Sequence, residues 1–419
     1  MINDDDRFNF DCDMYNNLNE NDKTFNLSQD VDPEFNFYNS LNVLSIYLYP
    51  TDIIHHISSC NNFNLIHINS RSTLNKMNDI NILLSVSEID FHVLAVSETW
   101  LNDDSAEFLS LPTYKFLYRN RLFKQGGGLG FFIKDNLTFI IRDDLCPVSS
   151  GFECFVIEII RRKQHNILIF AIYRPPNLNP MDFIDSLTCS LIAAQKLAKN
   201  KHVYVVGDFN INLLAGDVQN IGSYFYNSLM SINFFPLINK PTRITEFSAT
   251  LIDNIFTNNI QKHFSGIIYS DISDHLPIFC ACHDTFSVAN HFNGNINNNL
   301  SQKNLHALNI ALSQIEWSSV IETSDVNEAF GNFVDIFKST IEKYCPPVHP
   351  KLKRLKYPWI TPGLIKSLKT KNKLYRKFLK NPSEDNRIKY TKHKNYFTFL
   401  KREAEKRYIA NQSMKTKRI

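Results

Sequence analysis

The chain is 419 residues long, 43% of them hydrophobic, with a formal net charge of +3 at pH 7. This length exceeds one average domain, so we expect one large domain with additional segments. No apolar run approaches the ~20 residues that span a bilayer, which argues against a membrane protein. The eight cysteines form no Cys-x-x-Cys pair, and the N-terminus has no apolar signal segment. We therefore expect no zinc site, no disulfides and no secretion, but an intracellular protein, nuclear or cytoplasmic.

The amino-acid composition and the hydrophobic pattern of the chain change near residue 60. Residues 1–59 are acidic and rich in asparagine, and we expect most of them to be disordered. Across residues 60–283, short runs rich in Val, Ile and Phe alternate with helical patterns such as 182–198, which predicts a layered α/β domain. Segment 152–160 alternates like a half-exposed strand. The glycines at 126–128 predict a tight turn, or a loop that other backbone can approach closely.

An aspartate and an asparagine follow a buried strand of this domain. The apolar run 203–206 leads into Gly207, Asp208 and Asn210. The last two side chains lie two positions apart and point the same way in extended chain, so together they can hold a water molecule whose proton the carboxylate takes. A Gly-Asp turn after a strand is also common in proteins that catalyse nothing. This motif alone therefore does not decide the function.

Other polar side chains adjoin apolar runs in the same manner. These positions are Asn69, Glu98, Tyr173, Asp253, Asp274 and His275. Taken singly, each has a structural explanation: a core tyrosine with its hydroxyl at the surface, a glutamate that begins a loop, or an aspartate that caps a helix. Their repetition at the ends of buried strands indicates one shared site.

The local sequences around these residues form six blocks. They are Asn69-Ser70-Arg71-Ser72, Ser97-Glu98-Thr99-Trp100, Ile172-Tyr173-Arg174-Pro175-Pro176, Gly207-Asp208-Phe209-Asn210, Ile252-Asp253-Asn254-Ile255-Phe256 and Ser273-Asp274-His275-Leu276-Pro277. In this order they resemble the endonuclease/exonuclease/phosphatase superfamily, over about residues 63–282. The amino-acid sequences of these blocks are most similar to the endonuclease domain of non-LTR (LINE-type) retrotransposons. The resemblance implies a four-layered α/β sandwich, in which two packed, mainly antiparallel sheets are flanked by helices. Asn254 departs from it, because the family often has an apolar residue there.

The resemblance also implies a role for each residue. Hydrolysis of a phosphodiester needs a hard cation, for which we expect Mg²⁺, with Mn²⁺ as an alternative. The implied metal ligands are Asn69, Glu98 and Asp274. The implied catalytic residues are Asp208 as the base, Asn210 as the positioner of water, Tyr173 as a donor to phosphate, His275 as the stabiliser of negative charge and Asp253 as its carboxylate partner. Arg71 and Arg174, beside two of the blocks, are expected to contact nucleic acid.

The C-terminal part is predicted to be helical and basic. A polar, Asn-rich linker is expected at 284–300, followed by a basic helical region at 301–419. Thr361 can cap a helix that has Pro362 at its first position. The segment from Lys351 to the end carries 22 Lys+Arg against 4 Asp+Glu. It is similar to the connector that precedes the reverse transcriptase in these elements, and we expect the reverse transcriptase itself to be absent.

This positive charge has two interpretations, a solvated face or a contact with nucleic acid. We favour the contact, because clustered cations interleaved with aromatic residues neutralise phosphates. The residues expected to make it are Lys366, Lys369, Lys373, Arg376 and Lys377. The apolar stripe on the same helices needs a partner, so either the chain is a truncated copy or the stripe packs onto something else. Since every expected catalytic residue lies between Asn69 and His275, we expect catalysis to survive without residues 351–419.

The sequence therefore predicts a Mg²⁺-dependent endonuclease that nicks DNA to leave a 3′-hydroxyl. Its expected partner is DNA, with the RNA of the element or a reverse transcriptase as further candidates, and no membrane. One alternative is another phosphodiesterase or phosphatase of the same superfamily. The other is a truncated or host-adopted copy that binds nucleic acid and cuts nothing. Nicking of supercoiled plasmid in Mg²⁺ or in EDTA distinguishes these functions.

Overall fold

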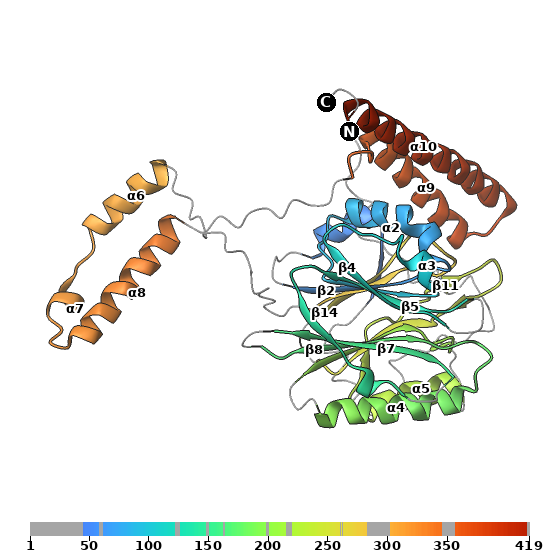
Figure 1. Cartoon of the computed structure of the whole chain (residues 1–419), viewed down its shortest axis with the longest axis horizontal. Coiled ribbons are helices and arrows are strands. Elements are labelled where there is room, and N and C mark those ends of the chain that lie inside the picture. Colours follow the sequence, from blue (N-terminus) through green and yellow to red (C-terminus); the bar gives the residue numbers. More distant parts are fainter. Residues whose placement is uncertain are drawn as a thin grey trace. The chain divides into compact units, whose positions relative to one another are not determined.

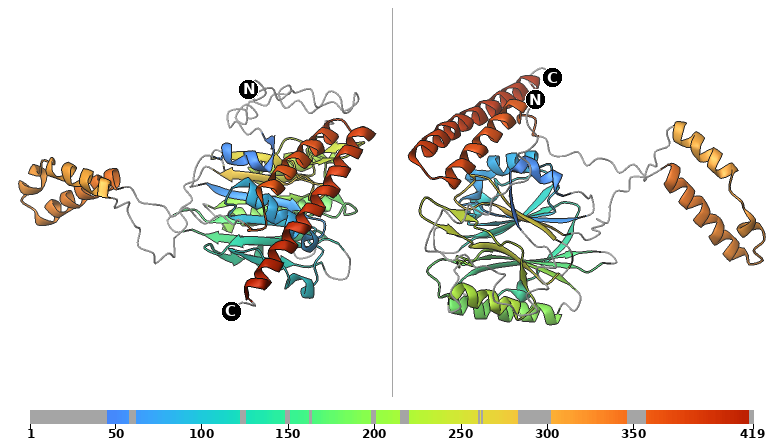
Figure 2. Two further views of the ribbon diagram at one scale, coloured as in Figure 1. Left: turned by 90° about the horizontal axis from the view of Figure 1, so that it is seen from above. Right: turned by 180° about the vertical axis from the view of Figure 1, so that it is seen from behind.

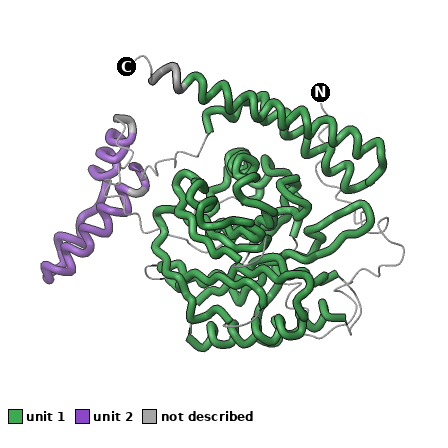
Figure 3. Tube along the Cα trace, turned by 45° about the vertical axis from the view of Figure 1, so that its right-hand side comes forward, with its two compact units in different colours: residues 1–289, 355–419 green, residues 290–354 purple. Residues whose placement is uncertain are grey.

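The chain forms two compact units. The computed structural model describes residues 45–57, 62–121, 126–147, 151–161, 164–197, 201–214, 220–259, 261, 263–282, 302–345 and 357–416. One unit comprises residues 1–289 together with 355–419, and the other comprises residues 290–354 (Figure 3). The segment 1–44 of the expected disordered region and the expected linker 284–300 lie outside the described residues. Among the described residues, no helix combines the length and the apolar character needed to cross a membrane.

A seven-stranded mixed sheet forms the first inner layer of the α/β domain. Its strands, in spatial order, are β1 (Ile46–Leu48), β14 (His263–Ile268), β15 (Ile278–Cys282), β2 (Phe63–Asn69), β3 (Val93–Ser97), β5 (Leu129–Lys134) and β4 (Tyr114–Arg119). The pairs β1–β14 and β2–β3 are parallel and the other pairs are antiparallel. Strand β1 and the 3-10 helix η3 (Pro50–His55) belong to this domain. The predicted start at residue 60 is therefore too late, because a three-residue edge strand gives a weak sequence pattern.

A six-stranded sheet forms the second inner layer. Its strands, in spatial order, are β10 (Phe235–Pro236), β13 (Asp253–Thr257), β9 (His202–Asp208), β8 (Ile167–Tyr173), β7 (Glu153–Ile160) and β6 (Thr138–Ile141). Only β8 and β9 of this sheet pair in parallel. Strand β7 is buried on both faces, whereas the sequence predicted a half-exposed strand. Its Glu158 can be buried because Arg142 and Lys201 neutralise the charge of the carboxylate. A separate two-stranded ribbon joins β11 (Arg243–Ile244) to β12 (Ala249–Thr250).

Helices cover the outer faces of both sheets (Figure 1). Helix α2 (Thr73–Ser87) lies on the first sheet, whereas α4 (Pro180–Leu197) and α5 (Ile221–Met230) lie on the second. Two shorter elements, α3 (Asp103–Ala106) and η4 (Asp143–Leu145), lie in connections. Large apolar side chains such as Phe131, Phe155 and Tyr204 fill the space between the sheets. The predicted four-layered α/β sandwich is confirmed.

The apolar stripe of the C-terminal helices packs on the α/β domain itself. Helices α9 (Pro362–Lys380) and α10 (Glu384–Thr416) form what we call the C-terminal helical hairpin, which lies over α2 (Figures 1 and 2). Ile82 and Val86 of α2 share a buried cluster with Leu368 and Phe397 of the hairpin. As predicted, Thr361 caps α9, its hydroxyl accepting a hydrogen bond from the amide of Leu364. The hairpin is thus a fifth layer over part of the sandwich.

Residues 302–345 of the second unit form three helices. These are α6 (Gln302–Ser313), α7 (Ser318–Ile321) and α8 (Val326–Tyr344). Asp325 caps α8 through hydrogen bonds from the amides of Asn327 and Glu328. The region predicted as one basic unit at 301–419 is therefore divided. The reason is that α6 to α8 pack on one another, whereas the hairpin buries its stripe against the α/β domain.

Candidate active site

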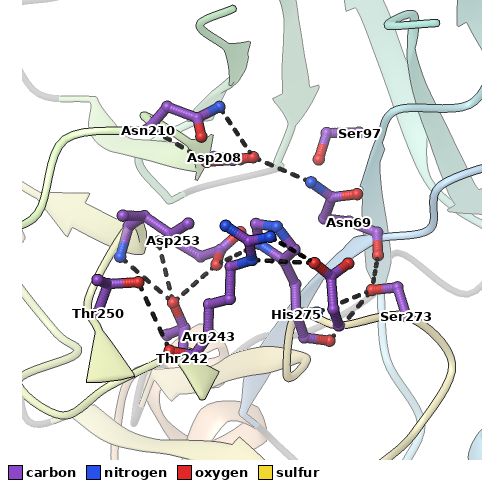
Figure 4. A network of polar contacts seen from close by, with 12 residues as sticks. Asn69, Ser97, Asp208, Asn210, Thr242, Arg243, Thr250, Asp253, Ser273 and His275 are labelled. Carbon is purple, nitrogen blue, oxygen red and sulfur yellow. Dashed lines mark hydrogen bonds and ion pairs between the residues drawn. The ribbon is translucent and has the colours of Figure 1, made fainter. Parts of the chain in front are cut away.

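The ends of strands from both sheets bring the predicted site residues together. Parallel pairing of β8 with β9 sets Tyr173 opposite Asp208, and antiparallel pairing of β13 sets Asp253 opposite Asp208. In the facing sheet, Asn69 ends β2, and Glu98 follows β3 directly. Segments more than 200 residues apart in the sequence thus meet in one network of polar contacts (Figure 4).

Asn69 connects the two sheets. Its Nδ2 donates to Glu98 Oε1 at 2.9 Å and to Asp208 Oδ2 at 3.0 Å. Its Oδ1 is buried and accepts no hydrogen bond from any described residue. Glu98 also accepts a hydrogen bond from Trp100 Nε1 at 3.2 Å, and its backbone is left-handed, with φ 50°. Left-handed backbone at a non-glycine residue is typical of a site where function is favoured over local stability.

Asp208 and Asn210 form a rigid pair. The amide N–H of Asn210 donates to Asp208 Oδ1 at 3.0 Å, and Asn210 Nδ2 donates to the carbonyl of Arg174 at 2.8 Å. Burial, followed by the nearby charge of Asp253, raises the pKa of Asp208 to about 8. The turn requires Gly207, because a Cβ there would collide with the carbonyl of Ile172. The pair therefore offers a carboxylate of raised proton affinity beside a fixed carboxamide.

His275 is held by a buried carboxylate that is itself held by a threonine. Its Nδ1 lies 2.8 Å from Asp253 Oδ2, which also accepts from Thr242 Oγ1 at 2.7 Å. Although burial disfavours the charged ring, Asp253 raises the pKa of His275 to about 9. The imidazole is therefore a cation near neutral pH with its orientation fixed. Sequence reasoning did not find Thr242, because its role depends on contact with a residue in another segment.

The donor atoms of the site fit a hard cation. Glu98, Asp208 and His275 each offer one ligand atom, and these atoms all lie within 4.8 Å of one another. Two carboxylates and the free Oδ1 of Asn69 form the oxygen-rich set that Mg²⁺ and Mn²⁺ prefer. A protonated imidazole does not bind a metal, so His275 is better suited to contact an anion.

Asp274 lies outside this donor set. Its carboxylate pairs with Arg71 Nη1 at 2.9 Å and with Arg243 Nη2 at 2.9 Å. Although burial opposes the charged form, the hydrogen bond from Arg71 and the charges around it lower the pKa of Asp274. Asp274 is thus paired with two guanidinium groups, and its expected role as a metal ligand, like the expected contact of Arg71 with nucleic acid, stays a prediction.

The other predicted cations divide into buried and exposed sets. Arg174 is buried, and its guanidinium donates to the carbonyls of Leu178, Phe209 and Asn210 at 2.6–2.7 Å. It supports the Asp208 turn rather than contacting nucleic acid, which corrects the expectation. Arg376 is partly buried, and its guanidinium lies over the rings of Tyr49 and Tyr269. The exposed set consists of Lys366, Lys369, Lys373 and Lys377.

Tyr173 borders the site beside a glycine loop. Burial, reinforced by the negative charges of Glu98 and Asp208, raises the pKa of Tyr173, so its hydroxyl keeps its proton and remains a donor. Arg121 stacks on its ring at 5.3 Å. The expected loop at 126–128 has positive φ at all three glycines, and the N–H of Gly128 donates to Glu153 Oε2 at 2.5 Å. Glu153 had no signal in the sequence.

Asn254, at a position where the family often has an apolar residue, forms hydrogen bonds with backbone groups. Its side chain is fully buried, donates from Nδ2 to the carbonyl of Ile238 at 2.8 Å and accepts from the N–H of Ile238 at 3.2 Å. A buried amide with both groups bonded carries little penalty. The neighbouring Asp253 therefore keeps its position.

Taken together, the fold is a two-sheet sandwich with carboxylates, amides and a charged histidine at one edge, a set of groups that suits the hydrolysis of phosphate esters. A family model for the Endonuclease/Exonuclease/phosphatase family matches residues 40–275, more than half of the chain. The chain belongs to this family.

Three solved structures are among those to which this chain is similar. The endonuclease domain of TRAS1, a telomere-specific non-LTR retrotransposon, is 14% identical, with a TM-score of 0.42, covering 54% of this chain and 100% of its own. The AP endonuclease LMAP from Leishmania major is 14% identical, with a TM-score of 0.46, covering 61% and 96%. The catalytic domain of Xenopus laevis APE2 is 16% identical, with a TM-score of 0.41, covering 54% and 95%. Among curated proteins, no match is found.

Proposed function

We propose that the chain is a Mg²⁺-dependent endonuclease that nicks DNA and leaves a 3′-hydroxyl, as a retrotransposon-type enzyme does. One observation carries the proposal: Asn69 links the carboxylates of Glu98 and Asp208 within reach of the charged imidazole of His275. A general base, an anion-stabilising cation and oxygen donors for a metal are the groups that hydrolysis of a phosphodiester needs.

Each residue has one role in this proposal. Glu98 and Asn69 would hold Mg²⁺, with Mn²⁺ as a substitute, and the bound cation would neutralise charge on the phosphate. Asp208 accepts the proton of the attacking water, which Asn210 orients. His275, fixed by Asp253, stabilises the negative charge that develops on the phosphate oxygens. Tyr173 remains protonated and donates to phosphate.

Nucleic acid is the proposed partner of the C-terminal helical hairpin as well. Lys366, Lys369, Lys373 and Lys377 are exposed along α9, while the apolar side of the same helix is buried. A helix that is fixed on one side and cationic on the other can contact phosphates without first folding. DNA is the proposed ligand, and element RNA competing with it would be a second outcome of a binding measurement.

The proposed activity is tested on supercoiled plasmid. Purified full chain should convert it to the nicked circle in Mg²⁺ or Mn²⁺ and not in EDTA. Extension of the nicked product by a DNA polymerase without prior phosphatase treatment would show a 3′-hydroxyl. A chain that binds plasmid and leaves it supercoiled in every metal would refute the endonuclease. Release of phosphate from a phosphomonoester without nicking would favour a phosphatase of the same family.

A further inference from the structure

Asp271 connects the loop that carries His275 to the C-terminal helical hairpin. The side chain of Asp271 is 8% exposed. Its Oδ1 accepts from Lys371 Nζ of α9, and its Oδ2 accepts from the hydroxyl of Tyr390 of α10 at 2.8 Å. Lys394 Nζ of α10 lies 3.4 Å from the same Oδ2. One carboxylate from the sandwich is thus bonded by both helices of the hairpin.

The loop is fixed at its other side by the end of β2. It joins β14 to β15 through residues 269–277. Ser273 Oγ donates to the carbonyl of Asn69 at 2.6 Å and accepts from the N–H of His275 at 3.1 Å. His275 therefore lies two residues from a contact with the proposed metal ligand and four residues from a contact with the hairpin. Only three residues separate Asp271 from His275, so the short backbone between them couples their positions.

The contact between Lys371 and Asp271 is desolvated. The side chain of Lys371 is 7% exposed, and its Nζ lies 4.5 Å from the centre of the Phe397 ring. Removing one partner of such a pair leaves an uncompensated buried charge, a large perturbation. A second ion pair also joins the hairpin to the sandwich, between Lys401 and Asp79 of α2 at 2.7 Å. That pair is more exposed, and Asp79 lies on α2 rather than on the loop that carries His275.

We infer that the C-terminal helical hairpin is a positioning element of the active site, in which Lys371 and Tyr390 hold Asp271 and thereby fix the loop that sets His275 against Asp253. The catalytic consequence of this inference rests on the proposed function. It reverses the expectation that residues 351–419 can be removed without loss of catalysis. Neither residue touches the reacting atoms, so both act through the loop.

The test compares two substitutions in the full chain. Lys371→Met removes the buried charge beside the loop, and Lys401→Met removes the matched ion pair on α2. Lys371→Met should lower the single-turnover nicking rate about tenfold or more, since small displacements of a catalytic group have effects of this size. The Kd for DNA should not change, because Lys371 is buried. Lys401→Met should lower thermal stability and leave the rate unchanged. Adding Asp271→Asn to Lys371→Met removes the carboxylate that has lost its closest cation and should restore most of the rate.

A readout without activity separates this inference from the proposed function. The NMR signals of the His275 ring, assigned with His275→Gln, should shift in Lys371→Met and stay in place in Lys401→Met. Unchanged ring signals in Lys371→Met would overturn the inference, as would equal rate losses in both variants. If the unaltered chain nicks nothing, the endonuclease is refuted while the ring signals still decide whether the hairpin positions the histidine.

Discussion

Two buried aspartates of this protein have opposite surroundings. Asp208, in the candidate site, is bonded by neutral amides and lies near the carboxylates of Asp253 and Glu98, and burial raises its pKa to about 8. Asp271, under the C-terminal helical hairpin, is bonded by Lys371 and Tyr390. Although burial opposes the charged form, the two lysines lower the pKa of Asp271.

The surroundings of Asp208 suit catalysis, whereas those of Asp271 hold two parts of the structure together. A carboxylate without a cation is costly to bury and is retained where a proton or a metal ion has to be bound. A carboxylate that is neutralised by the protein has no capacity left for a ligand, and its interactions hold two elements together. Substitutions at the two aspartates should therefore have opposite effects on stability and on catalysis.

The largest expected effect is on the nicking rate. Glu98→Gln should abolish nicking in Mg²⁺, and Asp208→Asn and His275→Ala should each lower the rate by ~10²-fold or more, as for loss of a metal ligand, a base or a charge-stabilising donor. The measurement is single-turnover conversion of supercoiled plasmid, with circular dichroism to verify folding. Full nicking by Glu98→Gln at ordinary Mg²⁺ would remove Glu98 from the site.

The next effect is on the free energy of unfolding. Lys371→Met should destabilise the full chain by ~3 kcal/mol, because the buried carboxylate of Asp271 loses its closest cation and keeps only Lys394, 3.4 Å away. Asp208→Asn should be neutral or stabilising in EDTA, because burial of the Asp208 carboxylate and the nearby charge of Asp253 outweigh the attraction of the charged His275. Denaturant unfolding of both variants measures the two changes. If Asp208→Asn were as destabilising as Lys371→Met, the distinction between the two aspartates would not hold.

The pH dependence of stability should also differ between the two aspartates. The folded pKa of Asp271 is lowered, so its contribution is present above the unfolded value of ~3.9 and is lost as the pH falls through the folded pKa. The groups that face it are Lys371, Tyr375, Tyr390 and Lys394. The folded pKa of Asp208 is raised, so the folded state holds the extra proton and Asp208 reduces stability as the pH rises.

Unfolding curves in EDTA from pH 3 to 9 would measure this contrast. The difference in stability between the unaltered chain and Asp208→Asn should widen between about pH 4 and pH 8 and then level off. The penalty of Asp271→Asn should be constant above about pH 4 and shrink in more acidic solution. Parallel curves for the two variants would mean that the charged surroundings do not control these groups.

The strand-end pattern was enough to identify the residues that the structure brings together. Asn69, Glu98, Asp208, Asp253 and His275 all follow or begin buried strands, and the order of strands in a sandwich gathers such ends at one edge. The two-sheet fold followed from the same runs together with the family resemblance.

The sequence did not reveal partners that depend on tertiary contact. Thr242 bonds Asp253 across a turn, and Lys371 bonds Asp271 from 100 positions away. Neither contact is indicated by a periodic pattern in the sequence. The two guanidinium partners of Asp274, Arg71 and Arg243, likewise come from other segments of the chain. The amphipathic stripe of α9 predicted a helix and a buried face, but not the surface that covers it.

The smallest effect on folding and on chemistry is expected from the exposed lysines of α9. Changing Lys366, Lys369, Lys373 and Lys377 to Gln should leave stability within ~0.5 kcal/mol of the unaltered chain, in contrast to Lys371 on the buried side of the same helix. The same change should weaken DNA binding, and the slope of log affinity against log salt should shrink by about three to four units if all four contact phosphates. Binding measured between about 50 and 200 mM salt, with plasmid nicking in parallel, tests both statements. An unchanged slope would make these lysines a solvated face, and the hairpin would then act only through Lys371 and Tyr390, on the position of His275.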